Sequence, residues 1–110
     1  MFIGTGWDIH KHSKSKPLTL GGVVFDEDGF EAHSDGDILL HALIDAILGA
    51  TGNKDIGHYF PSNENTPDNM PSFEMLKEIL EQINFSRFAI NNIDMTIISQ
   101  KINISSKREV

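Results

Sequence analysis

The chain has 110 residues, of which 39% are hydrophobic and 23% charged, so it can form one domain with a modest core. The absence of cysteine excludes disulfides and thiolate metal sites. A net charge of -7 argues against nucleic acid or an anionic membrane as a partner, because both repel an acidic protein. No apolar run reaches the roughly 20 residues of a membrane helix, and the first residues lack the pattern of a signal peptide.

The apolar pattern predicts one mixed α and β domain without repeats or internal boundaries. Helices are predicted where apolar residues recur every three or four positions, and strands where they alternate. Ser72 has N-cap chemistry for the second helix, and the long loop before it is expected to be functional or disordered. The expected elements, in chain order, are a strand at 1–9 interrupted by two glycines, a surface loop at 10–17, two short extended pieces at 18–20 and 23–25, a helix from 35 or 36 to 48, a loop at 53–70, a helix at 72–83 and a strand at 90–99.

The first predicted helix is apolar at nearly every position, which indicates burial on most sides. Its polar residues Asp37, His41 and Asp45 recur every four positions and therefore share one face. A buried polar group without partners costs roughly 2–7 kcal/mol, so this face requires a cleft, a metal ion or its own hydrogen-bond network. On the helix alone, a core histidine bonded to both carboxylates is the simpler interpretation.

A second pair of ligand-type side chains lies near the N-terminus. Asp8 and His10 are two residues apart in a predicted strand, so they point to the same face. With His41 they would form an Asp/His/His set with an open fourth position, which is typical of a catalytic rather than a structural zinc site. The pair alone is a weak signal, because the end of a strand at the surface can have the same composition.

The hexapeptide Ala-His-Ser-Asp-Gly-Asp at 32–37 precedes the first helix. Backbone N–H groups at a helix start receive anions, and His33 is able to donate to a phosphate oxygen. Ordinary helix capping by Ser34 or Asp35 is the alternative, and the two roles are compatible. In the long loop, the glycine of Asp-Ile-Gly at 55–57 would let a ligand approach the backbone.

Eight short motifs occur in a fixed order along essentially the whole chain. They are Gly-Trp-Asp-Ile-His at 6–10, Gly-Gly-Val at 21–23, Ala-His-Ser-Asp-Gly-Asp at 32–37, His-Ala-Leu at 41–43, Asp-Ala at 45–46, Asp-Ile-Gly at 55–57, Phe-Pro at 60–61 and Asp-Met-Thr-Ile-Ile at 94–98. In this order and spacing the chain resembles the 2-C-methyl-D-erythritol 2,4-cyclodiphosphate synthase family. The His-Ser-Asp-Gly-Asp block followed by His41 is the most specific part of the resemblance.

The resemblance implies an α/β enzyme of the α+β type, with a mixed sheet packed on helices, that forms a homotrimer around a central axis with sites between subunits. It implies a phosphorus–oxygen lyase of the non-mevalonate pathway of isoprenoid (terpenoid) biosynthesis. In that reaction the 2-phosphate of 4-diphosphocytidyl-2-C-methyl-D-erythritol 2-phosphate attacks the β-phosphorus, the cyclodiphosphate closes and CMP leaves. Such an enzyme is expected in a bacterial cytoplasm or a plastid stroma.

The family also implies roles for individual residues. Zn2+ is expected on Asp8, His10 and His41, with Asp45 orienting His41, and Mg2+ or Mn2+ is expected on the substrate diphosphate. His33 is the expected catalytic residue, which would hold the 2-phosphate together with its neighbour. A loop at residues 99–105 is expected to close over cytosine from a neighbouring subunit. The expected substrate-binding residues are Asp8, Ile9, His10, His33, Ser34, Asp55, Ile56, Gly57, Phe60, Pro61, Ser62, Asn63, Glu64, Ser99, Gln100, Lys101, Ile102, Asn103, Ile104 and Ser105.

Three departures from the family pattern modify these expectations. The acidic loop after Phe-Pro keeps only one carboxylate, that of Glu64, and the usual Pro-Lys pair is replaced by Ile102-Asn103. The sequence also ends at Val110, before the family's threonine segment, last strand and helix. We therefore expect a single domain over 1–110 that is truncated at its C-terminus and is poorly soluble or inactive alone, unless the sequence is a fragment of a longer product.

Two other functions fit the same residues. The first is a catalytically impaired remnant that keeps zinc or nucleotide-diphosphate binding, and the missing threonine segment favours it. The second is an acidic scaffold whose helix stripe is only a hydrogen-bond network. The complete set of Asp8, His10 and His41 favours the enzyme, and an absence of stoichiometric zinc would favour the scaffold.

Overall fold

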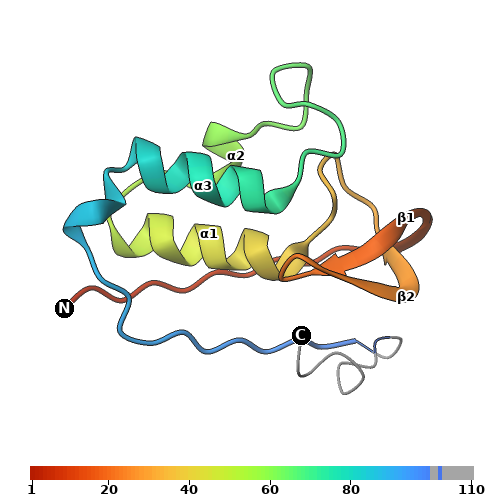
Figure 1. Ribbon diagram of the computed structural model, residues 1–110, viewed down its shortest axis with the longest axis horizontal. Helices are drawn as coiled ribbons and strands as arrows, with labels where there is room; N and C mark the ends of the chain where they lie inside the picture. The colour runs from red at the N-terminus through yellow and green to blue at the C-terminus, as the bar shows by residue number, and fades with distance from the viewer. Residues whose placement is uncertain (100–101, 103–110) are drawn as a thin grey trace.

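The computed structural model describes residues 1–99 and 102 (Figure 1). Two helices, α1 and α3, lie side by side, and a β-hairpin lies at one end of this pair. The N-terminal segment runs along α1 on the side away from α3. The elements are β1 (His12–Leu20), β2 (Val23–Phe30), α1 (Ile38–Ala50), α2 (Ile56–Tyr59), α3 (Ser72–Gln82) and the 3-10 helix η1 (Phe85–Arg87).

The hairpin is a two-stranded antiparallel sheet. Gly21 and Gly22 form its turn with φ angles of 59° and 79°, a left-handed conformation that glycine adopts at little cost. The register is interrupted between Ser13 and Pro17, so residues 14–16 form a bulge on β1. The surface loop predicted at 10–17 is therefore wrong in most of its length, because the hairpin ladder extends into a polar sequence that does not alternate.

The core consists of two clusters of buried apolar side chains, and α1 packs against the first and belongs to the second. The cluster under the hairpin contains Leu18, Leu20, Phe25 and Phe30, with Ile38 and Leu39 packed against it. The cluster between the helices contains Ile44, Leu48, Met75 and Ile79. Because α1 packs on the hairpin at one end and on α3 along its length, nearly all of its positions are apolar. Each such buried side chain contributes about 1.5–3 kcal/mol.

Asp37 ties the start of α1 to the hairpin turn. Its carboxylate accepts hydrogen bonds from the N–H groups of Leu40 at 3.1 Å, Gly21 at 2.9 Å and Gly22 at 2.8 Å. The side chain is fully buried. Burial raises the pKa of the Asp37 carboxyl, and the three N–H groups oppose that rise. One carboxylate thus caps a helix and fixes a turn 15 residues away in sequence.

The start of α3 differs from the prediction. Pro71 occupies the N-cap position and Ser72 is the first helical residue, so the expected N-cap role of Ser72 is wrong. Its hydroxyl and N–H instead donate to the carboxylate of Asp35 at 2.5 Å and 2.9 Å. A carboxylate that is distant in sequence therefore supplies the acceptor that the local side chain was expected to supply.

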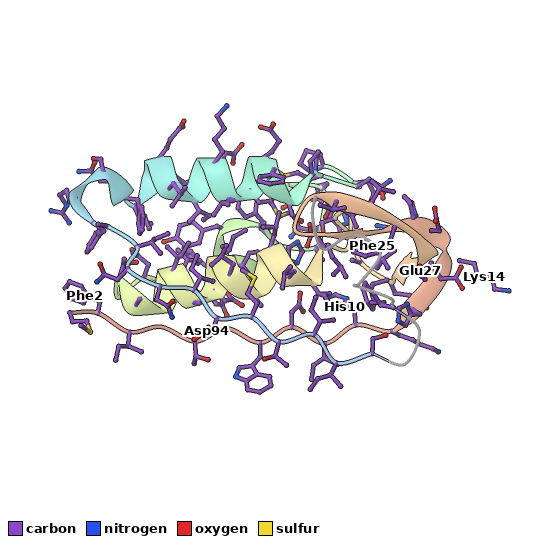
Figure 2. All side chains as sticks on the ribbon, turned by 60° about the horizontal axis from the view of Figure 1, so that its bottom comes forward. Phe2, His10, Lys14, Phe25, Glu27 and Asp94 are labelled. Carbon is purple, nitrogen blue, oxygen red and sulfur yellow. The ribbon has the colours of Figure 1, made fainter. Side chains whose placement is uncertain are left out.

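The predicted strands at 1–9 and 90–99 are extended but belong to no sheet, and within the described residues the sheet contains only β1 and β2. The expected mixed sheet is thus replaced by a small antiparallel one. Both extended segments run in the same direction along one side of the molecule (Figures 1 and 2). The rings of Phe2 and Phe88 meet edge to face at 5.7 Å near one end, and His12 bonds to Ser99 near the other.

Two glycines bring the N-terminal segment against α1. A Cβ at Gly4 would lie 1.9 Å from the Ala46 carbonyl oxygen, and a Cβ at Gly6 would lie 1.8 Å from that of Ala42. Any other residue would hold the segment away from the helix. The glycines that interrupt the predicted strand are therefore packing positions. None of the helices in the described part is both long enough and apolar enough to span a membrane.

Candidate metal and phosphate site

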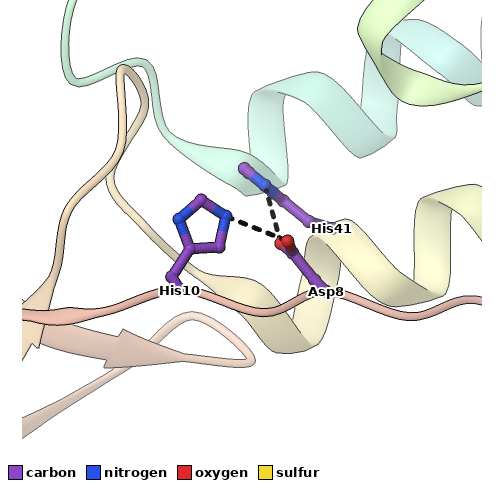
Figure 3. A group of neighbouring side chains, drawn as sticks. All are labelled: Asp8, His10 and His41. Carbon is purple, nitrogen blue, oxygen red and sulfur yellow. Dashed lines mark ion pairs between the residues drawn. The ribbon is translucent and has the colours of Figure 1, made fainter.

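Asp8 and His10 meet His41 of α1 in one place (Figure 3). One carboxylate oxygen of Asp8 lies 2.9 Å from Nε2 of His10, and the other lies 3.4 Å from Nδ1 of His41. One ligand-type atom from each residue lies within 4.8 Å of the other two. Because residues 8 and 10 alternate with exposed residues, the extended segment presents both side chains to the helix.

The second nitrogen of each imidazole has a partner outside this group. Nδ1 of His10 lies 2.6 Å from the carbonyl oxygen of Glu31, and Nε2 of His41 lies 3.2 Å from the hydroxyl of Ser34. A proton on Nδ1 of His10 leaves Nε2 free to bind a cation. Such partners fix the orientation of both rings.

The three residues fit a divalent metal ion. One carboxylate oxygen of Asp8 is buried and accepts no hydrogen bond within the described chain, a costly state for a carboxylate. A cation between Asp8, His10 and His41 would satisfy that oxygen. One oxygen and two imidazole nitrogens with an open side match the donor set of a catalytic zinc site.

The group opens into a cavity of about 190 Å³. His33 and Ser34 form part of the wall beside His41, and the start of α2 forms another part. The lining residues are Asp8, His10, Ala32, His33, Ser34, His41, Asp45, Ile56, Gly57, Phe60, Ser62, Thr66 and Met75. Ligand-type side chains, a hydroxyl and an apolar wall thus surround one volume, which is typical of a small-molecule site.

The long loop, which in the structure is the segment at 60–71 between α2 and α3, contacts both nitrogens of the His33 side chain. Nε2 of His33 lies 2.5 Å from the carbonyl oxygen of Thr66, and Nδ1 lies 3.3 Å from a carboxylate oxygen of Asp68. Ser34 is buried, and its hydroxyl accepts from the N–H of Gly36 at 3.2 Å. The two residues with phosphate-binding chemistry are therefore oriented by their surroundings.

The three polar residues that were predicted to share one face of the first helix have three different roles. Asp37 caps the helix, His41 joins Asp8, and Asp45 accepts from the N–H of Ile56 at 2.7 Å. Burial raises the pKa of the Asp45 carboxyl, and the Ile56 N–H opposes the rise. The interpretation of His41 as a core histidine bonded to Asp37 and Asp45 is wrong, because its ring nitrogens face Asp8 and Ser34.

Several expected substrate-binding residues do not line this cavity. The Ile9 side chain is exposed, Asp55 caps α2, and Ile102 packs on the hairpin core. Ser99 is bonded to His12. Three further residues, Pro61, Asn63 and Glu64, follow the cavity residue Phe60 without lining the cavity. The predictions for Gln100, Lys101, Asn103, Ile104 and Ser105 lie outside the described residues.

Sequence reasoning also missed contributors to the site. Ala32, Thr66 and Met75 line the cavity, and Asp68 pairs with His33. Ala32, Thr66 and Met75 carry no local signal, because a main-chain carbonyl or an apolar wall can come from any residue. Asp68 is one of three acidic residues at 53–70, and nothing in the sequence distinguishes it from the others. Only the path of the long loop brings them to the cavity.

A family model described as the YgbB family matches residues 1–110. The chain belongs to this family. It is 49% identical over 100 residues to the 2-C-methyl-D-erythritol 2,4-cyclodiphosphate synthase of Francisella tularensis subsp. novicida, covering 89% of this chain and 63% of that protein. It is 43% identical over 106 residues to the bifunctional enzyme IspD/IspF of Campylobacter concisus, covering 96% of this chain and 28% of that protein.

Solved structures agree with this family membership. The CDP complex of IspF from Plasmodium falciparum superposes with a TM-score of 0.76 at 40% identity, covering 98% of this chain and 66% of that one. A 2C-methyl-D-erythritol-2,4-cyclodiphosphate synthase in a form bound to CDP gives a TM-score of 0.66 at 37% identity, covering 77% and 57%. The family identified from the sequence motifs is therefore confirmed. This chain spans less than two thirds of the length of these relatives.

Proposed function

We propose that this chain carries the metal and phosphate site of a cyclodiphosphate synthase. The protein would convert 4-diphosphocytidyl-2-C-methyl-D-erythritol 2-phosphate into 2-C-methyl-D-erythritol 2,4-cyclodiphosphate and CMP, a step of non-mevalonate isoprenoid biosynthesis. The main support is the meeting of Asp8, His10 and His41 beside His33 and Ser34 in one cavity. The names of the curated relatives give further support.

Asp8, His10 and His41 would hold Zn2+, and the substrate diphosphate would carry Mg2+ or Mn2+. A bound divalent ion supplies Lewis-acid stabilisation of the charge that develops on the β-phosphate. The Glu31 carbonyl and the Ser34 hydroxyl keep the two imidazoles in the orientation that such binding needs.

The remaining residues would position the phosphates. Transfer at phosphorus depends mainly on alignment and charge stabilisation, and the attacking 2-phosphate is already an anion, so no strong base is needed. His33 and Ser34 would hold this 2-phosphate. Both ring nitrogens of His33 face groups of the loop, so the phosphate would replace the exposed carboxylate of Asp68 at Nδ1, while Thr66 continues to orient the ring through Nε2. Ile56 and Gly57 would contact the methylerythritol part, and residues 60–64, of which Phe60 and Ser62 line the cavity, would lie along the diphosphate.

We further propose a homotrimer in which residues 99–105 contact the cytosine bound at a neighbouring subunit. Residues 1–110 would form one domain. A bacterial cytoplasm or plastid stroma stays a prediction from the family.

The alternative is a chain that binds zinc and a nucleotide diphosphate without turnover. The cluster of Asp8, His10 and His41 is compatible with it, because metal binding does not by itself require turnover. Both functions predict a metal and CDP, and only the enzyme predicts release of CMP.

Three measurements on one preparation test the proposal. Metal analysis should give one zinc per chain, calorimetric titration should show CDP binding, and chromatography should detect CMP released from the substrate. His41→Ala should remove the zinc, whereas His58→Ala, which changes an exposed histidine of α2, should keep it. Zinc and CDP binding without CMP would favour the alternative, and a chain that binds neither contradicts both functions.

A further inference from the structure

Lys16 contacts the segment that carries the proposed phosphate-binding residues. Its ammonium donates to the carbonyl oxygens of Ala32 and Ser34, the residues on either side of His33. Lys16 does not itself line the cavity. We infer that Lys16 is a positioning residue that holds His33 and Ser34 ready for the 2-phosphate, an inference that rests on the proposed function.

A bulge on β1 directs the Lys16 side chain inward. Residues 14–16 have no partners on β2, because Ser13 pairs with Gly29 and Pro17 pairs with the adjacent Asp28. Bulges of this kind redirect side chains and are common beside active sites. In this bulge the Lys16 ammonium reaches inward to the backbone, whereas Lys14 points away from the molecule (Figure 2).

Gly29 and Pro17 fix the backbone of the bulge. A Cβ at Gly29 would lie 2.4 Å from the Pro17 carbonyl oxygen and 2.7 Å from that of Lys16, so a larger residue would displace both. A proline also restricts the residue before it to extended conformations, which applies to Lys16. The position of the lysine backbone is therefore determined by both strands.

The same segment is held from its opposite edge. The N–H of Asn69 donates to the His33 carbonyl oxygen at 2.8 Å. The carbonyl oxygens of residues 32–34 are thus bonded alternately to Lys16 and to the long loop. This fixes the peptide groups on both sides of His33 and, through them, the directions of the His33 and Ser34 side chains.

The charge on Lys16 gives these bonds their strength. Hydrogen bonds from an ionised donor are stronger than neutral ones, and partial burial reduces competition from water. Replacing Lys16 with methionine keeps most of the side-chain volume and leaves both carbonyl groups without this donor. The segment should then loosen while the bonds made by Asp37 at the other end of the hairpin stay intact.

Amide hydrogen exchange of the zinc-loaded chain tests this positioning directly. In Lys16→Met the amide of Asn69 should exchange about tenfold faster, whereas the amide of Gly22, which bonds to Asp37, should keep its rate. Lys14→Met is the matched control and should leave both rates unchanged, and Lys16→Arg should restore most of the protection at Asn69. Equal Asn69 rates in Lys16→Met and the wild type would overturn the inference.

Ligand binding tests the consequence. Titrations followed by NMR would use two unreactive probes, 2-C-methyl-D-erythritol 2-phosphate and CDP. Lys16→Met should bind the 2-phosphate probe about tenfold more weakly and CDP as the wild type does. An equal loss for both probes would indicate general damage and overturn the positioning role.

A third probe separates this inference from the proposed function. If the wild type binds 2-C-methyl-D-erythritol 2-phosphate no better than unphosphorylated methylerythritol, the 2-phosphate role of His33 and Ser34 is wrong, and the inference fails with it. If the wild type distinguishes these two compounds and Lys16→Met distinguishes them equally well, only the role of Lys16 is wrong.

Discussion

The two faces of the N-terminal segment have opposite environments. On the face toward α1, Asp8 and His10 contact His41 and the backbone of Glu31. On the other face, Trp7 and Ile9 are 78% and 88% exposed. Simple alternation along an extended chain separates the two sets. The difference shows that the candidate metal site depends on docking of the segment onto the helix, because no strand ladder holds the segment in the described chain.

The largest effect on zinc affinity is expected at Gly6, where the N-terminal segment lies closest to α1. A Cβ at Gly6 would lie 1.8 Å from the Ala42 carbonyl oxygen, so Gly6→Ala should push Asp8 and His10 away from His41. Overpacking of this kind costs about 1–3 kcal/mol. Zinc affinity, measured by competition with a chelator, should fall roughly 10–100-fold.

Gly49→Ala provides the control for this prediction. Gly49 lies within α1, and a Cβ there would meet nothing within 4 Å. Alanine should stabilise the helix by up to about 1 kcal/mol and leave zinc affinity unchanged. Equal zinc affinity in Gly6→Ala and the wild type would show that docking of the segment does not assemble the site.

Loss of the hydrogen bonds by which Asp37 joins α1 to the hairpin turn should have the next largest effect, in this case on stability. Asp37→Asn replaces an acceptor of three N–H groups with a side chain that has one oxygen and an NH2 group. The free energy of unfolding, measured with urea, should fall by about 1–3 kcal/mol. A loss below about 0.5 kcal/mol, the usual size of a surface effect, would contradict this role.

The same pair of proteins gives a pH test. Burial raises the pKa of Asp37 above its ordinary 3.8, so the fold prefers the protonated carboxyl. This contribution to stability is complete below about pH 3.8 and is lost as the pH rises through the folded-state pKa. The stability advantage of the wild type over Asp37→Asn should therefore shrink as the pH is raised. An advantage that grows with pH would show that the N–H groups outweigh burial.

A smaller effect on zinc affinity is expected from loss of the Ser34 hydroxyl, which contacts the His41 nitrogen that does not face Asp8. Ser34→Ala removes the hydroxyl that lies 3.2 Å from Nε2 of His41. Loss of such an orienting partner weakens metal binding by about 10–100-fold, and the length of this contact places the expected loss near the lower end, about 10-fold. Chelator competition should show this loss, and Ser86→Ala in η1, an exposed serine, should show none. An unchanged affinity in Ser34→Ala would mean that Asp8 alone orients the ring.

Local patterns predicted the helices and the residues that meet at the site. The helix expected from 35 or 36 to 48 is observed at Ile38–Ala50, and the one expected at 72–83 is observed at Ser72–Gln82. Both have apolar residues at helical spacing, which is a local property. The period of two places Asp8 and His10 on one face, and the family motifs relate them to His41.

Features that depend on distant partners could not be predicted in this way. The Asp35 carboxylate at the start of α3 comes from 37 residues away, and the bulge that directs Lys16 depends on Gly29 of the opposite strand. The segments at 1–9 and 90–99 alternate as strands do, but alternation does not specify a hydrogen-bonding partner. Tertiary packing determines these features.

Substitutions on the solvent-exposed face of the segment at 90–99, which we call the outer face, should change the free energy of unfolding least. Ile97 packs on the hairpin core, whereas its neighbour Ile98 is 89% exposed. Ile97→Asn should lower the free energy of unfolding by at least about 1 kcal/mol, because it places an amide against apolar side chains. Ile98→Asn should change it by less than about 0.5 kcal/mol and raise solubility, since it interrupts an exposed apolar surface. Equal losses in the two variants would mean that the outer face is covered in solution, and the contrast between the two faces of the extended segments would then be wrong.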